Sequence, residues 1–141
     1  MAHVHRVLCL SLLALAGSWS PGFAQRSDAP NNVCQGLANV PTGTCFGGEY
    51  ERASNELDAF LAQIRDALTQ PEDRTRLDKA QNAWVKYRDL TCDADSKVYF
   101  GDGSGRGTEV ATCLDVETRL RLKDLHAIYD WRVEWMRRQR E

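Results

Sequence analysis

The chain has 141 residues, of which 43% are hydrophobic and 27% are charged, and its formal net charge is -2 at pH 7. That length supports one small domain with a modest core. The negative balance disfavours nucleic acid as a partner, because phosphates select basic surfaces. Residues 25–118 hold 10 basic and 16 acidic side chains, whereas residues 119–141 hold 7 basic and 4 acidic ones. An acidic body of this kind favours a basic protein partner through long-range steering.

Residues 1–24 have the features of a secretory signal peptide. A basic residue precedes an apolar run over residues 7–16, and the small residues Gly22 and Ala24 suit cleavage after Ala24. The run is too short to span a bilayer, which takes about 20 residues. Cys9 lies inside the run and away from the cleavage position, where a lipid would be attached. We therefore expect a periplasmic or secreted protein with no membrane anchor.

Four cysteines follow the expected signal peptide, namely Cys34, Cys45, Cys92 and Cys113. An even number of cysteines in an oxidising compartment predicts two disulfides. Three pairings are possible. The local pairing, Cys34 with Cys45 and Cys92 with Cys113, is favoured because each pair brackets one irregular stretch, and each bridge would stabilise the fold by about 3 kcal/mol. A zinc site is disfavoured because no C-x-x-C spacing occurs.

Residues 25–48 are expected to form an irregular segment pinned by the first disulfide, because they contain two prolines and four glycines. A helical domain is expected over residues 49–141. Its first helix starts at Glu49 and ends before Pro71, since the residue before a proline is pushed out of the helical conformation. Apolar residues recur along this helix at intervals of three and four: Tyr50, Ala53, Leu57, Phe60, Leu61, Ile64 and Leu68.

A second helix is expected to begin at Pro71, because proline is tolerated at the first helical position. The short connection makes it antiparallel to the first helix. Its expected core stripe is Leu77, Ala80, Trp84, Tyr87, Thr91, Ala94 and Val98. Beside this stripe, Arg88 is expected to stack on an aromatic ring or to pair with a carboxylate. Four glycines within residues 101–107 form the loop that ends the helix.

A third helix is expected after this loop, with Thr108 as its cap. Its periodic residues are Leu114, Thr118, Leu122, Leu125, Ile128, Trp131 and Trp135. We expect Trp131 and Trp135 to continue the packing stripe, and the alternative is a basic tail that contacts a partner or a membrane surface. The predicted fold class is therefore all-α, a small three-helix antiparallel domain stapled by two disulfides.

The sequence offers little catalytic or metal-binding chemistry. Outside the expected signal peptide His126 is the single histidine, so packing or surface exposure is its expected role. A serine nucleophile of the G-x-S-x-G type needs a turn from a strand to a helix, and no strand is predicted before Ser104. The glycine run does not match a phosphate-binding motif. Asp93, Asp95 and Asp102 do not form a calcium loop, because Lys97 falls where an oxygen ligand belongs. We expect no cofactor, no metal and a binding function.

Four short motifs follow Cys34 and Cys45 in the chain. They are N-E-L-D at residues 55–58, A-Q-x-A-W-x-x-Y-R-D-x-x-C at 80–92, G-S at 103–104 and T-x-x-R-x-x-x-L at 118–125. In this order and spacing, the chain from Cys34 to about Leu125 resembles the LprI-like lysozyme inhibitor family. The residues that mainly carry this resemblance are Gln81, Trp84, Tyr87, Arg88, Asp89, Thr118, Arg121 and Leu125.

The resemblance implies a small helical exported domain that is no enzyme, and that binds and inhibits lysozyme-type muramidases, with a basic lysozyme as its protein partner. The candidate inhibitory loop consists of Asp102, Gly103, Ser104 and Arg106, because a glycine-rich loop is slim enough to enter a sugar-binding cleft. The alternative is an envelope structural or stress-related protein-interaction module without lysozyme inhibition. An enzyme that acts on cell-wall glycan is the least favoured function.

Overall fold

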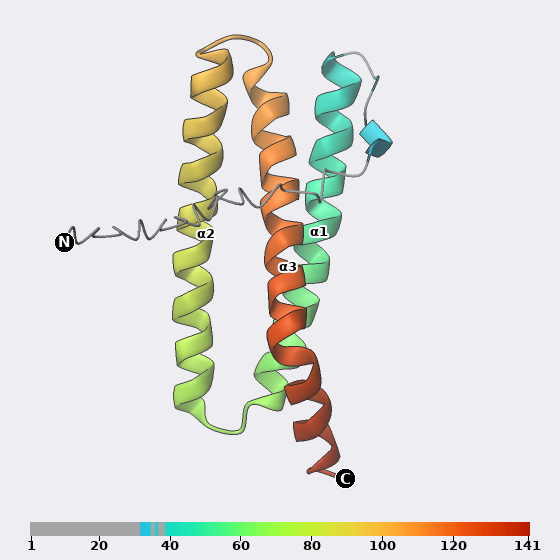
Figure 1. Cartoon of the computed structure of the whole chain (residues 1–141), viewed down its shortest axis with the longest axis vertical. Helices are drawn as coiled ribbons and strands as arrows, with labels where there is room; N and C mark the ends of the chain where they lie inside the picture. Colours follow the sequence, from blue (N-terminus) through green and yellow to red (C-terminus); the bar gives the residue numbers. More distant parts are fainter. Residues whose placement is uncertain (1–31, 35, 37–38) are drawn as a thin grey trace, which may run out of the picture.

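The computed structural model describes residues 32–34, 36 and 39–141, and the expected signal peptide lies outside these residues. A short 3-10 helix, η1 (Asn32–Cys34), precedes three long helices: α1 (Asn39–Ala67), α2 (Pro71–Phe100) and α3 (Arg106–Arg138). Consecutive helices run in opposite directions (Figure 1). The described part of the chain contains no strand, and the predicted all-α three-helix fold is confirmed.

Helix α3 is the centre of the domain. It packs extensively along α1 and less extensively along α2, whereas α1 and α2 make little direct contact; Figure 1 shows α3 between the other two helices. The apolar core fills the end of the bundle where α1 ends and α2 begins. Its buried members are Leu57, Phe60, Leu61, Ile64, Ala67, Leu77, Leu125 and Val133. The opposite end, near the α2–α3 loop, therefore depends more on disulfides and polar contacts.

Helix α1 starts ten residues earlier than predicted, so residues 39–48 are helical and not irregular. Pro41 lies in the first turn, where its missing N–H has no helical partner to lose. A Cβ added at Gly43 would lie 2.9 Å from Thr108 Oγ1, so this glycine allows α1 to approach α3 closely. Phe46 is buried. These tertiary contacts outweigh the low helix propensity of the glycines, which was the basis of the prediction.

Both disulfides have the predicted local pairing. Cys34 is joined to Cys45, with Cα atoms 5.7 Å apart, and Cys92 is joined to Cys113, with Cα atoms 5.5 Å apart. The first bridge ties η1 to α1, and the second ties α2 to α3.

The buried face of α2 differs from the predicted stripe. Its buried residues are Leu77, Gln81, Arg88, Cys92 and Ser96, which recur every fourth position or so. Tyr87 and Val98, predicted as core, are 58% and 81% exposed; Ala80 and Ala94 are exposed as well. The disulfide explains the difference, because Cys92 must face α3 to reach Cys113 and this requirement sets the rotation of α2 about its axis. The stripe through Tyr87 then points outward.

The prediction of which face of α3 is buried is also wrong over the second half of the helix. Thr118 and Leu125 are buried as predicted, but Trp131 and Trp135 are 63% and 53% exposed, and Ile128 is also exposed. Val133 is buried in their place. The helix begins at Arg106 with Gly105 as its N-cap, so Thr108 lies inside the first turn and is not the cap.

His126 packs as the sequence predicted, because its ring is stacked on that of Phe60 with centroids 3.8 Å apart. None of the helices in the described residues contains a stretch long and apolar enough to cross a membrane.

Candidate functional site

The family-like motif residues of α2 and α3 meet around one buried arginine. The Arg88 side chain is only 10% exposed. Its guanidinium lies 5.0 Å from the ring centroid of Trp84, one helical turn away, and 5.4 Å from that of Tyr50 on α1. The cation is therefore held between two aromatic rings from different helices, an arrangement that offsets part of the loss of its hydration.

The polar contacts of Arg88 complete its environment. Its Nε and Nη2 atoms donate hydrogen bonds of 2.9 and 2.7 Å to Asp89 Oδ1. Its Nη1 atom donates a long hydrogen bond of 3.4 Å to Thr118 Oγ1 on α3. Both expected roles of Arg88, ring stacking and pairing with a carboxylate, are confirmed.

A second arginine from α3 extends this cluster. Arg121 Nε donates a hydrogen bond of 3.2 Å to Gln81 Oε1, and its guanidinium lies 5.7 Å from the Trp84 ring centroid. Trp84 thus contacts two cations that come from two helices. Because an arginine carries five donors in a fixed plane, such contacts fix the relative position of α2 and α3.

The structure separates the other motif residues from this cluster. Leu125 belongs to the apolar core, and Tyr87 points outward. Conversely, Tyr50 stacks on Arg88 although the sequence placed it only in a packing stripe. An aromatic residue beside an arginine on the same helix can be predicted from spacing, but a ring supplied by another helix cannot.

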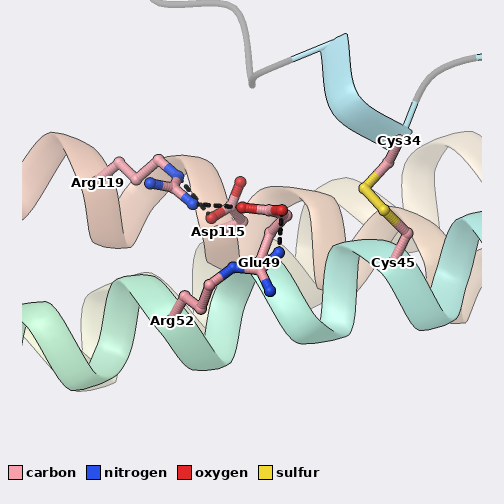
Figure 2. A network of polar contacts seen from close by, with 6 residues as sticks. All are labelled: Cys34, Cys45, Glu49, Arg52, Asp115 and Arg119. Atoms are coloured by element: carbon pink, nitrogen blue, oxygen red, sulfur yellow. Dashed lines mark hydrogen bonds and ion pairs between the residues drawn. A yellow bond between two sulfur atoms is a disulfide. The ribbon is translucent and has the colours of Figure 1, made fainter.

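A second polar network joins α1 to α3 (Figure 2). Arg119 lies between two buried carboxylates: its Nε donates to Asp115 Oδ1 at 2.8 Å, and its Nη2 donates to Glu49 Oε2, also at 2.8 Å. Arg52 pairs with the other oxygen of Glu49. The two carboxylates are enclosed and bound to arginines, so this network suits a structural tie between helices. The contact between Arg119 and Glu49 was not predictable from the sequence, because the two residues are 70 positions apart in the chain.

Burial raises the pKa of Asp115 above its ordinary value. The neighbouring Arg119 lowers this pKa by charge and by hydrogen bonding, Glu49 raises it and Arg52 lowers it, but loss of hydration dominates. The folded protein therefore binds the Asp115 proton more tightly than the unfolded chain does. This contribution to stability is present below about pH 4 and is lost as pH rises through the raised pKa.

Asp115→Asn is expected to remove this pH dependence. As pH rises from about 3.5 to 6, the free energy of unfolding of the wild type should fall relative to that of the variant, because asparagine does not ionise. Urea unfolding of both proteins at several pH values measures the difference, and the comparison cancels the titration of carboxylates that lie away from Asp115. A difference that stays constant across this range would contradict a raised pKa.

The loop between α2 and α3 is a compact turn of residues 101–105, shorter than the seven residues expected. Gly103 N donates to Phe100 O at 2.8 Å, and Arg106 N donates to Gly103 O at 3.1 Å. A Cβ added at Gly105 would lie 2.5 Å from the Phe100 ring, so the ring covers this glycine closely. The loop is thus held by its own hydrogen bonds and by one aromatic side chain.

Two of the four candidate loop residues bind back to α2. Asp102 pairs with Lys97, and Arg106 pairs with Asp93. The Nε atom of Arg106 is buried and has no hydrogen-bond partner in the part of the chain that the structure describes. Ser104 is exposed. In this conformation Ser104 is the polar side chain of the loop that is best placed to meet a partner.

An apolar surface adjoins the loop along α2. Leu90 is 72% exposed, and with Tyr87 and Val98 it forms what we call the outer face of α2. These residues, together with Thr91, Ala94 and Asp95, border a shallow hollow of about 460 Å³. The part of the predicted α2 core stripe that includes Tyr87, Ala94 and Val98 is therefore a solvent-exposed surface, whereas Leu77 belongs to the core.

Among the described residues, no group of three or more histidine, cysteine or acidic side chains is placed to hold a metal ion. The chain is a disulfide-crosslinked three-helix domain whose motif residues mostly form a structural arginine cluster. Residues 34–125 match the family model described as lysozyme inhibitor LprI. Because this match covers more than half of the chain, the chain belongs to that family. Comparisons with curated proteins and with solved structures found no match.

Proposed function

We propose that this protein is exported and that it binds and inhibits a lysozyme-type muramidase without enzymatic activity of its own. Membership of the lysozyme inhibitor LprI family is the observation that carries the proposal. The acidic balance of residues 25–118 supports it, because an acidic surface attracts basic lysozymes over long distances. The two disulfides suit an oxidising compartment outside the cytoplasm.

The proposed contact surface is the α2–α3 loop together with the outer face of α2. The loop is compact, and the Cys92–Cys113 bridge holds the helices that carry it, so little conformational entropy would be lost on binding. Exposed Ser104 would donate a hydrogen bond to a carboxylate in the sugar-binding cleft. Arg106 would join such a contact only by exchanging its present partner, Asp93.

The outer face of α2 would supply the apolar part of the contact. Tyr87, Leu90 and Val98 form a continuous stripe on a single helix, which suits packing against another protein. Aspartates flank this stripe: Asp93 is already paired with Arg106, whereas Asp95 has no ion pair within the described residues. A basic partner complements this combination better than a second, equally acidic copy of the same face.

A muramidase assay with variants tests this proposal. Ser104→Ala is expected to raise the concentration needed for half-inhibition about tenfold, the effect of losing one hydrogen bond to a charged group. Arg106→Ala and Leu90→Ala should also weaken inhibition, and inhibition should decrease between low and moderate salt because charges are then screened. Arg137→Ala, an exposed change at the far end of α3, serves as the control and should have no effect.

Two other results would contradict the proposed contact surface or the proposed function. Inhibition that none of the three substitutions affects would place the contact on another surface of the domain. Absence of inhibition of every lysozyme class would favour the alternative, an envelope structural or stress-related interaction module.

A further inference from the structure

A groove separates the first half of α2 from the second half of α3. Its volume is about 900 Å³, within the range of pockets that take molecules of drug size. Apolar side chains dominate its lining, including Leu77, Leu125, Trp131, Trp135 and Met136. The two tryptophans are more than half exposed. They were predicted as core residues, and in the structure they form a wall of what we call the tryptophan groove.

The charged residues of the tryptophan groove are mainly arginines. Of the described residues, three arginines line it, Arg76, Arg121 and Arg132, against one carboxylate, Asp73, which is paired with Arg76. Arg121 is bound to the neutral amide of Gln81. Arg132 is held by two rings, 5.1 Å from the Trp131 centroid and 5.7 Å from the Tyr129 centroid.

Neither Arg121 nor Arg132 therefore has a carboxylate partner among the described residues, although both border an apolar groove. A cation beside an apolar surface that excludes water attracts an anion more strongly than one surrounded by solvent. The ring contacts orient Arg132 before any ligand arrives, which lowers the entropy lost on binding. The tryptophan groove thus combines an apolar floor with two positive charges at its border.

We propose that the tryptophan groove binds a free single-chain anionic amphiphile of the long-chain carboxylic acid class. The hydrocarbon chain would lie against Trp131, Trp135 and the leucines, and the carboxylate would be bound by Arg132. Arg121, about 16 Å away along α3, would add to the positive potential of the groove. A flat bilayer fits less well, because the site is recessed between two helices. A second copy of this part of α3 would bring arginine against arginine. This site is separate from the loop and outer face of α2 and does not depend on lysozyme inhibition.

Calorimetric titration of the purified protein with dodecanoate, below its micellar concentration, tests the proposal. We expect one dodecanoate per chain and binding at least about tenfold tighter than that of dodecyltrimethylammonium, which has the same chain and the opposite charge. Arg132→Gln should weaken dodecanoate binding about tenfold, and Trp131→Ala should also weaken it. Arg137→Gln is the matched control, because Arg137 is exposed on the same helix outside the groove; it should bind as the wild type does.

Four outcomes would overturn the proposal. Equal binding of the cationic probe would show that charge plays no part, and unchanged dodecanoate binding by Arg132→Gln would place the amphiphile elsewhere. Sedimentation with phosphatidylglycerol vesicles without binding of free dodecanoate would identify a membrane surface as the occupant. A dimer in light scattering that Trp131→Ala converts to a monomer would identify a second copy. Thermal unfolding of each variant without ligand shows that the substituted proteins remain folded.

Discussion

Replacing Trp84 with alanine is expected to lower the free energy of unfolding by about 3 kcal/mol, near the lower end for removal of a buried aromatic side chain. Trp84 is partly buried against the core, and two guanidinium groups lie over its ring. Its removal leaves a cavity and withdraws one of the two rings that hold the buried Arg88. Both effects destabilise the contact between α2 and α3.

Tyr87→Ala is the matched control for this experiment. Tyr87 lies three residues further along the same helix and belongs to the same predicted stripe, but 58% of it is exposed. We expect a change below about 0.5 kcal/mol, as for most surface substitutions. Urea unfolding followed by circular dichroism measures both variants. Equal losses of stability in the two variants would contradict the rotation of α2 that turns Tyr87 toward solvent.

Removal of the second disulfide, by Cys92→Ser with Cys113→Ser, is expected to lower the free energy of unfolding by about 3 kcal/mol. The bridge closes a segment with a sequence separation of 21, and a crosslink around a loop of that length raises the free energy of the unfolded chain by about this much, because it removes conformational entropy. It also joins α2 to α3 close to the loop, at the end of the bundle that lies away from the apolar core. Inhibition should therefore weaken beyond the loss explained by unfolding.

The double variant Cys34→Ser with Cys45→Ser provides a comparison. The bridge between Cys34 and Cys45 has a sequence separation of 11. Its removal should lower the free energy of unfolding only slightly less than removal of the second bridge, because the entropy of loop closure depends on the logarithm of loop length. Inhibition by the folded fraction should be retained, because this bridge ties η1 to α1 and not the helices that carry the loop. Urea unfolding and the muramidase assay measure the two effects separately. Equal loss of inhibition in both double variants would contradict a specific role for the loop.

Local patterns in the sequence determined the number of helices, their order and the disulfide pairing. The stripe from Ala53 to Ile64 faces the core as predicted, because apolar residues at intervals of three and four leave α1 only one face to bury. Stacking of Arg88 on Trp84 was also predictable, since residues four apart on a helix are neighbours. The loop position followed from its glycines, which disfavour a helix.

Only the tertiary structure decided which faces of α2 and α3 are buried. Helix α2 has two possible faces, the apolar stripe through Tyr87 and the polar row through Arg88. Periodicity favoured the first, but the covalent bond from Cys92 to α3 and the ring contacts of Arg88 select the second. The tryptophan groove has the same origin, because α3 buries Val133 and leaves Trp131 facing outward. Hydrophobic periodicity defines an apolar face on an isolated helix. Which face is buried in the folded protein depends on how the helix is rotated about its axis, and this rotation is set by contacts with residues far away in the chain.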